Sequence, residues 1–340
     1  MQRRHVLAGL GSVWAWGPAG LAAPARLRPV TVVAQALDQI KQLPLVLAQR
    51  LGFFAAEGLD VNFQAVPASV RTLDALADLP AQVFAGTFER TLYLQARGRS
   101  HQAFVLVSRS PQVVLGTSTR LLPPDADLAD LAGSSIGVYA SGSMGHRVAQ
   151  WVLLRAGLRA SDVHFVEIPD PQQALEAFER GAIDAVSYTD PLITRLEQRG
   201  VIRVVSDTRS LRDCDQVFGG PVACTCLSAS PSFIEREPEL VQGLTNAVVR
   251  ALKWLHTAGP SDLVRFTPDA LMQGERAVFL SAFSRSRETL AADGTFAAQA
   301  PRNVMRALER LRLPIALEGV DPEAVYTNRF AQRAKVQFRV

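Results

Sequence analysis

The segment Ser141-Gly142-Ser143 is the part of the sequence whose residue types best fit ligand chemistry. It follows a short apolar run, residues 135–140, and precedes a helical pattern over residues 146–156. A helix that begins there leaves backbone N–H groups without internal partners, and its dipole adds positive potential, which together favour an anion. The glycine permits close backbone approach, and both serines add hydroxyl donors. The alternative is an ordinary N-cap, in which one serine only starts the helix.

Four other polar side chains lie where a predicted strand ends or a predicted helix begins. His146 falls in the first helical turn and could donate to an anion, or it could simply be exposed. Asp190 could pair with an amine or cap the turn before Pro191. Gln35 and Thr87 follow two predicted strands earlier in the chain. Ligands of open α/β sheets bind beyond the carboxyl ends of the strands, so all four belong to the predicted ligand site.

The sequence lacks the motifs of common catalytic and metal sites. It contains no Gly-x-Ser-x-Gly elbow, no phosphate-binding loop and no cluster of metal ligands at a suitable spacing. Its three cysteines, Cys214, Cys224 and Cys226, leave at least one thiol unpaired in a monomer. We expect buried small side chains, with the option of one bridge to Cys214. We therefore predict no metal ion, no cofactor and no enzymatic activity.

Length and composition describe the scaffold that must position these residues. The chain has 340 residues, 48% of them hydrophobic and 20% charged, which is enough for about two domains with a large core. This composition excludes a disordered chain and a small disulfide-stapled scaffold. The net charge is only +4, and we find no dense basic run, so we expect no nucleic-acid binding. Arginine supplies most of the positive charge, since the only lysines are Lys41, Lys253 and Lys335.

Residues 1–25 have the composition of a signal peptide. The arginine pair Arg3-Arg4 precedes an uncharged stretch over residues 6–25, which ends in a small-residue cleavage site at Ala25. The arginine pair also resembles a twin-arginine export signal. The alternative is an uncleaved membrane helix, but Gly and Pro residues interrupt the second half of the stretch. We predict a cleaved leader and a periplasmic protein.

An internal repeat predicts two lobes of similar topology. Strand and helix patterns alternate over residues 29–85, and the same order returns over residues 135–188. Asp60 and Asp162 begin matching segments 102 residues apart, and the same offset separates Thr87 from Thr189. Alternation of strand and helix predicts a parallel sheet in each lobe.

The last third of the chain is predicted to be helical and to cover the first lobe. The helical patterns lie over residues 239–257, 278–290 and 304–311. We then expect the chain to cross between lobes near residues 113–116 and 218–223. This assigns residues 29–115 and 222–340 to lobe I and residues 116–221 to lobe II. Two crossing strands form a hinge, and a hinge between two lobes makes a cleft that can close.

Four segments in this order resemble a known protein family. They are LGFFAAEGLDV at 51–61, DLAGSSIGV at 130–138 followed by Gly142-Ser143, GAIDA at 181–185 through Asp190-Pro191, and FIEREP at 233–238. The sequence is similar to nitrate/sulfonate/taurine-type periplasmic solute-binding proteins over residues 30–334. One departure is residues 78–82, where a glycine and an aspartate are usual.

The resemblance implies an α/β, type II periplasmic-binding-protein fold, with two similar lobes joined by a two-strand hinge. It implies a monomer that captures a small, anionic organic solute, sulfonate-like or similar, in the cleft and delivers it to the permease and ATPase of an ABC importer. Two alternatives remain. One is an enzyme on the same fold, similar to pyrimidine-precursor synthases or small lyases, and the other is a periplasmic sensor subunit.

Overall fold

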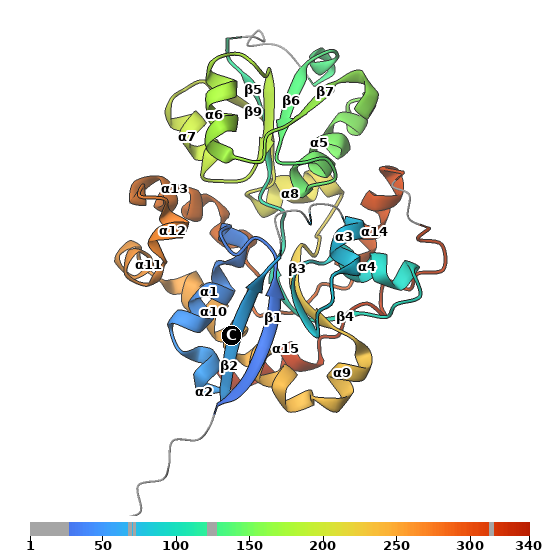
Figure 1. Ribbon diagram of the computed structural model, residues 1–340, viewed down its shortest axis with the longest axis vertical. Coiled ribbons are helices and arrows are strands. Elements are labelled where there is room, and N and C mark those ends of the chain that lie inside the picture. The colour runs from blue at the N-terminus through green and yellow to red at the C-terminus, as the bar shows by residue number, and fades with distance from the viewer. Residues whose placement is uncertain (1–26, 67–69, 71–72, 121–127, 313–315) are drawn as a thin grey trace, which may run out of the picture.

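Two lobes, each built around a five-stranded sheet, make up the described part of the protein (Figure 1). The computed structural model describes residues 27–66, 70, 73–120, 128–312 and 316–340. The predicted signal peptide and its cleavage site at Ala25 lie outside these residues.

The two sheets have the same internal strand order. The first runs β2-β1-β3-β10-β4 and the second runs β7-β6-β8-β5-β9. The strands of the first sheet are β1 (Arg28–Ala34), β2 (Leu59–Ala65), β3 (Val83–Thr87), β4 (Gln102–Ser108) and β10 (Thr225–Ala229). Those of the second are β5 (Val114–Ser118), β6 (Ser135–Val138), β7 (His164–Glu167), β8 (Ala185–Tyr188) and β9 (Ile202–Asp207). The shared order confirms the two similar lobes that the internal repeat predicts.

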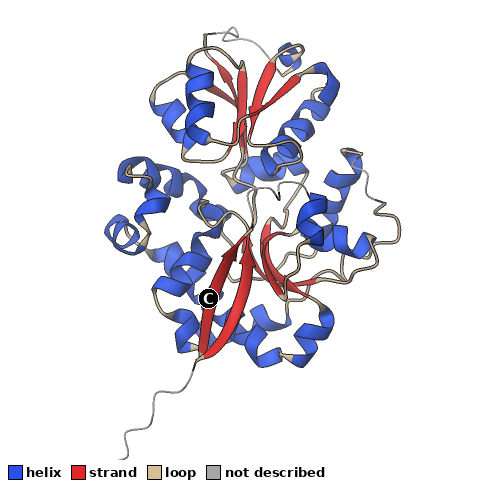
Figure 2. Cartoon of the chain, in the orientation of Figure 1, coloured by secondary structure: helices blue, strands red, loops and turns tan. Residues whose placement is uncertain are grey.

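Helices cover both faces of each sheet (Figure 2). The central strands β3, β5, β8 and β10 are therefore buried along their whole length. In the first lobe the helices are η1 (Ile40–Gln42), α1 (Leu43–Arg50), α2 (Phe53–Ala56), α3 (Leu73–Asp78) and α4 (Glu89–Ala96). In the second they are η2 (Ala129–Leu131), α5 (Met144–Arg155), η3 (Ala160–Asp162), α6 (Pro171–Glu179), α7 (Leu192–Gln198) and α8 (Leu211–Phe218).

Neither sheet is purely parallel, so that prediction was wrong. β10 is antiparallel to β3 and β4, and β5 is antiparallel to β8 and β9. The reason is that each of these strands enters its sheet from the other lobe. Because the parallel strands end at the edge that faces the hinge, a strand arriving from the hinge must run in the opposite direction.

The chain crosses between the lobes in two places. β4 of the first sheet leads into β5 of the second through residues 109–113, and β9 returns to β10 through residues 208–224, which include α8. β5 begins at Val114, which pairs with Tyr188 in the second sheet although the sequence analysis assigns residues 29–115 to lobe I. The other lobe boundaries stay a prediction.

The helical tail packs chiefly on the first lobe. Its elements are α9 (Pro231–Arg236), α10 (Pro238–Thr257), α11 (Pro260–Phe266), α12 (Asp269–Met272), α13 (Arg276–Ser286), η4 (Arg287–Thr289), α14 (Ala300–Arg310) and α15 (Arg329–Phe338). α10 buries its leucine-rich stripe against α1, α2, α15 and β4. The tail also reaches the second lobe, since α13 contacts α7 and α14 contacts α8.

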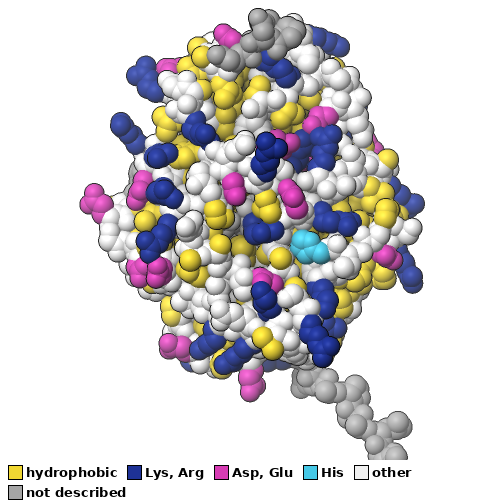
Figure 3. All heavy atoms as spheres, turned by 180° about the vertical axis from the view of Figure 1, so that it is seen from behind, with side chains coloured by type: hydrophobic (Ala, Val, Ile, Leu, Met, Phe, Trp, Pro, Cys, Tyr) yellow, Lys and Arg dark blue, Asp and Glu magenta, His cyan; other side chains and the backbone are white. Residues whose placement is uncertain are grey.

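The surface and the cysteines add three observations. None of the described helices combines the length and the hydrophobicity that a membrane crossing needs. On the face shown in Figure 3, basic and acidic side chains are interspersed. Cys214, Cys224 and Cys226 are all free and buried, so the bridge left open by the sequence is not formed.

Candidate functional site

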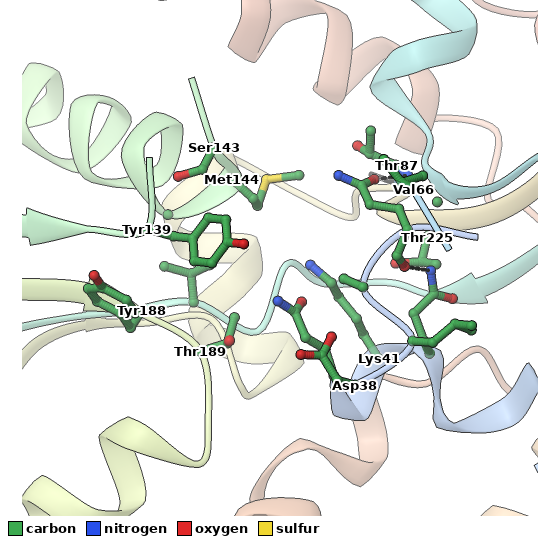
Figure 4. A pocket seen from close by; sticks show the side chains of 18 of the residues that line it. Asp38, Lys41, Val66, Thr87, Tyr139, Ser143, Met144, Tyr188, Thr189 and Thr225 are labelled. Carbon is green, nitrogen blue, oxygen red and sulfur yellow. Dashed lines mark hydrogen bonds between the residues drawn. The ribbon is translucent and has the colours of Figure 1, made fainter. Parts of the chain in front are cut away.

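A cavity of about 550 Å³ lies between the two lobes (Figure 4). The first lobe contributes the carboxyl ends of β1 and β3 and the start of β10. The second contributes the carboxyl ends of β6 and β8 and the first turn of α5. This is the place where open α/β sheets bind ligands, because loops and helix N-termini converge beyond the strand ends.

Five of the seven site residues predicted from the sequence line this cavity. They are Gln35, Thr87, Gly142, Ser143 and Asp190. The structure brings the first two from one lobe and the other three from the opposite lobe. Ser141 and His146 are not on the cavity wall, although both neighbour residues that are. Ligand contact stays a prediction for all seven.

Ser143 is the N-cap of α5. Its backbone is extended, and its Oγ accepts a hydrogen bond from the N–H of His146 at 3.3 Å. Gly142 precedes it with a φ of +73°, in the left-handed region that favours glycine. The capping role that the sequence left open is therefore real, and it leaves the serine on the cavity wall.

The N–H groups of Ser141 and Gly142 already have partners within the second lobe. Ser141 donates to the Glu167 carboxylate at 3.0 Å, and Gly142 donates to Nδ1 of His146 at 2.7 Å. The His146 ring packs edge-on against Phe165, with ring centroids 4.4 Å apart. His146 thus accepts a hydrogen bond from its own loop. Burial lowers its pKa, which keeps the ring neutral for this role.

The N–H groups that remain available belong to the first two residues of α5. Within the described structure, the N–H groups of Met144 and Gly145 have no hydrogen-bond partner. Both residues line the cavity. A Cβ on Gly145 would lie 2.4 Å from the carbonyl oxygen of Ser187, so glycine lets α5 begin directly against β8. Sequence reasoning missed Gly145, for which the signal was a glycine in a helical first turn.

An ion pair joins the lobes beside the cavity. Arg147 of α5 pairs with Glu89, at the start of α4, and also donates to the carbonyl oxygen of Gly142. The side chains of Arg147 and Glu89 are only 8% and 13% exposed. The Thr87 hydroxyl donates to the same carboxylate at 3.4 Å. Sequence reasoning missed this pair, although a cation in the first turn opposes the helix dipole and needs a partner.

Both carboxylate oxygens of Asp190 contact residues of the second lobe. One carboxylate oxygen accepts hydrogen bonds from the N–H and hydroxyl of Thr194 at 2.8 Å, and the other faces Arg209 at 3.3 Å. Burial by itself would lower the pKa of Arg209, but its hydrogen bonds to Glu197 and Asp207 raise it above the ordinary value. The sequence left open a pairing with an amine and a cap of the turn before Pro191; the observed partners of Asp190 are Thr194 and Arg209.

Lys41 and Asp38 carry the remaining charges of the cavity wall, and sequence reasoning missed both. Lys41 extends from η1 into the space between the lobes, and Asp38 lies beside it (Figure 4). Among the described residues, neither has a hydrogen bond or an ion pair through its side chain. The signal available for Lys41 was its rarity, since it is one of three lysines in the chain.

Apolar side chains separate the polar groups. Leu37 and Val66 line the cavity from the first lobe, and Tyr139 and Met144 line it from the second. Tyr188 also reaches the wall, but its hydroxyl donates to the carbonyl oxygen of Ile168 at 2.5 Å. The cavity therefore suits an organic ligand with an apolar middle part.

The cysteine side chains and the possible metal ligands of the described residues do not favour nucleophilic or metal chemistry. Cys224 lines the cavity, but burial raises the pKa of its thiol, which favours the protonated form. Burial likewise raises the pKa of Cys214 to about 12. Within the described residues there is no group of three or more His, Cys, Asp or Glu side chains that could hold a metal ion.

Residues 39–260 match the family model described as NMT1/THI5 like. The chain belongs to this family. The protein of Bacillus subtilis strain 168 named "Putative binding protein YtlA" is 22% identical over 237 residues, which are 68% of this chain and 67% of that protein. The name describes that relative as a binding protein.

Solved structures confirm the fold. A protein of Bordetella bronchiseptica RB50 is 36% identical with a TM-score of 0.82, covering 92% of this chain and 98% of that one. The alkanesulfonate-binding protein SsuA of Xanthomonas axonopodis pv. citri, bound to MOPS, is 19% identical with a TM-score of 0.64, covering 90% and 99%. The desulfurization enzyme DszB is 18% identical with a TM-score of 0.63, covering 92% and 99%, so the fold also occurs in an enzyme.

Proposed function

We propose that this family member is the extracytoplasmic solute-binding component of an ABC importer and that it captures a small organic anion, sulfonate-like or similar, between its lobes. The observation that carries the proposal is the cavity at the strand ends, which Met144 and Gly145 of the first turn of α5 line from the second lobe and Lys41 lines from the first. The sulfonate-binding protein with the same fold supports it. The partners that follow are a permease and an ATPase, and the protein acts as a monomer.

The size and lining of the cavity favour an organic anion over a bare oxyanion. About 550 Å³ lies within the range of sites for small organic molecules. Leu37, Val66, Tyr139 and Met144 offer apolar surface to the carbon part of such a ligand. The backbone N–H groups of Met144 and Gly145 then bind its charged group.

Contacts between the lobes support a cleft that closes on its ligand. Besides Arg147–Glu89, the pair Arg195–Glu275 joins the lobes at 3.0 Å. Closing removes water from the cavity, and the electrostatic contacts between an anion and its donors are stronger where water is excluded.

Export is part of the same proposal. If residues 1–25 are a cleaved signal peptide, the intact mass of the periplasmic protein corresponds to a chain that begins near Arg26. A mass that retains Met1 contradicts this. Replacing Arg3-Arg4 by two lysines separates the routes, since blocked export indicates the twin-arginine route and unchanged export the general one.

The test begins with the purified mature protein. Native mass spectrometry identifies any small molecule that co-purifies. Isothermal titration calorimetry then measures binding of ethanesulfonate, taurine, MOPS and nitrate, with glycerol as an uncharged control. We expect at least one organic sulfonate to bind and to raise the melting temperature. By mass action, a ligand at a hundredfold excess over its Kd stabilises the folded state by about 2.7 kcal/mol. A protein that carries no ligand and binds none of these anions contradicts the proposal.

A further inference from the structure

Lys41 is a cation that projects into the cavity without a counter-charge among the described residues. It comes from η1 in the first lobe and is partly buried. Figure 4 shows its side chain reaching across the space between the lobes, toward the side on which Tyr139 and Met144 lie. In the described structure its ammonium group has neither an ion pair nor a hydrogen bond. A partly buried ammonium without a partner is unfavourable, so the position indicates that a ligand group completes it.

The other charged residues of the cavity wall are not unpaired cations that a ligand could bind. Arg147 is paired with Glu89, and Asp190 with Arg209. Asp38 lies three residues before Lys41 but is exposed, and the two form no ion pair among the described contacts. Lys41 is therefore the lining cation that remains available to a ligand within the described residues.

The donors of α5 and the ammonium of Lys41 belong to opposite walls. Met144 and Gly145, whose N–H groups have no partner in the described structure, line the cavity from the second lobe, whereas Lys41 lines it from the first. The apolar side chains of Tyr139 and Met144 lie on the second-lobe side of the space that Lys41 enters (Figure 4). A cavity of about 550 Å³ leaves room for a ligand that reaches both walls.

We infer that Lys41 binds a second anionic group, so that the ligand class is a two-ended anion, such as a sulfonate that carries a carboxylate or a short dicarboxylate. This inference rests on the proposed function, because it assigns the first anionic group to the N-terminus of α5. Lys41 then selects ligands by a charge-assisted hydrogen bond, in which the ammonium donates to a carboxylate or sulfonate oxygen. A ligand with an apolar or cationic group at that end leaves the ammonium unpaired or repels it.

Two matched pairs of probes test the inference by isothermal titration calorimetry. Sulfoacetate differs from ethanesulfonate, and succinate from butyrate, by a carboxylate in place of a methyl group. The variants are Lys41→Gln, which removes the charge, and Lys41→Arg, which keeps it. Lys253→Gln is the matched control, because it removes one lysine charge on the outer surface of α10, where Lys253 donates to the carbonyl oxygens of Phe338 and Arg339.

We expect wild-type protein to prefer the two-ended member of at least one pair by about tenfold or more, which is about 1.4 kcal/mol. Lys41→Gln abolishes the preference, Lys41→Arg retains it, and Lys253→Gln matches the wild type. The melting temperature of ligand-free Lys41→Gln does not fall, since the side chain has no partner among the described residues to lose.

Four results overturn the inference. Equal affinity for both members of each pair, or a preference that survives Lys41→Gln, removes the role of Lys41 and leaves the proposed function standing. Equal weakening of both members by Lys41→Gln shows that Lys41 binds the single anion instead. Absence of binding by all four probes to the wild type overturns the inference, and it overturns the proposed function only if taurine, MOPS and nitrate fail to bind as well and no ligand co-purifies.

Discussion

Arg147 and Glu89 illustrate how single residues connect the ligand site to stability. Their charges are largely buried, and they belong to different lobes. Breaking a buried ion pair by removing one partner leaves the other charge uncompensated. The pair therefore stabilises the arrangement in which the lobes lie together, at the edge of the cavity that the ligand is proposed to fill.

Glu89→Gln should lower the free energy of unfolding by about 3 kcal/mol, because Arg147 then stays buried without its counter-charge. Urea unfolding followed by fluorescence measures it. Asp78→Asn is the matched control, since Asp78 pairs with Arg97 and Arg99 on the surface, where such pairs contribute about 1 kcal/mol or less. The double variant Glu89→Gln/Arg147→Met should regain stability. A cost no greater than that of the control variant contradicts the role of the pair.

Protonation of His101 makes the free energy of unfolding depend on pH. Burial, followed by the nearby charges of Arg90 and Arg99, lowers its pKa to about 4. The folded protein keeps the ring neutral, whereas the unfolded chain binds a proton near pH 6.5. The stability from this group is complete above pH 6.5 and is lost as pH falls toward 4, by up to about 1.4 kcal/mol per pH unit.

Replacing the ring should make that pH dependence shallower. We expect His101→Gln to lose less stability than the wild type between pH 6.5 and 5, a window above most carboxylate titration. His164→Gln is the control, because His164 is exposed on β7. Chemical denaturation at several pH values measures the slopes, and equal slopes for wild type and His101→Gln would show that this ring is already protonated in the fold.

Among the secondary-structure elements, the start of α5 forms part of the second-lobe wall of the cavity that the ligand is proposed to fill. Ser143 caps the helix, and Gly145 lets its first turn lie against the carbonyl oxygen of Ser187. The Ser187 hydroxyl also donates to the carbonyl oxygen of Gly145 at 2.8 Å. This close contact fixes the position of the first turn of α5 against β8. A change at Gly142 is a poorer test, because its φ of +73° strains any larger residue.

Gly145→Ala should push α5 away from β8, because its Cβ would lie 2.4 Å from a backbone oxygen that cannot rotate away. We expect a loss of about 1–3 kcal/mol in unfolding free energy and weaker binding of the sulfonate that binds the wild type. Gly259→Ala is the control, since its Cβ would lie 3.6 Å from Asp262. Calorimetry and urea unfolding measure both effects, and unchanged affinity would place the anion away from this turn.

The two crossings of the chain between the lobes allow each lobe to move as a rigid body. The crossings, residues 109–113 and 208–224, lie beside each other because β5 and β10 both start at the cavity. Movement about such a hinge changes the cavity without disturbing either sheet. The ion pairs that join the lobes, Arg195–Glu275 and Arg285–Glu197 among them, form only when the lobes are close.

Ligand should therefore reduce the radius of gyration of the protein. Small-angle X-ray scattering compares the ligand-free protein with protein saturated by the tightest-binding sulfonate of the panel. A smaller radius with that ligand is the expected result, since binding favours the state in which both walls contact it. An identical radius at verified saturation would indicate one rigid body.

Local sequence signals predict the secondary-structure elements and their repetition. Hydrophobic periodicity, caps and the 102-residue offset are local signals, and they located strands such as β2 and β7 and the helix at residues 146–156 within a few residues. Five of the seven predicted site residues reached the cavity wall, because strand ends and helix starts are themselves local features.

Which polar groups remain available to a ligand cannot be predicted from local sequence, because the partners of the paired groups lie far away in the chain. Arg147 lies 58 residues from Glu89 and Asp190 lies 19 from Arg209, so no local pattern shows that these charges are already paired. The direction of β5 and β10 likewise depends on the lobe from which each strand arrives. Ion pairing and strand direction follow from distances between remote segments, and those distances exist only once both lobes are folded and placed against each other.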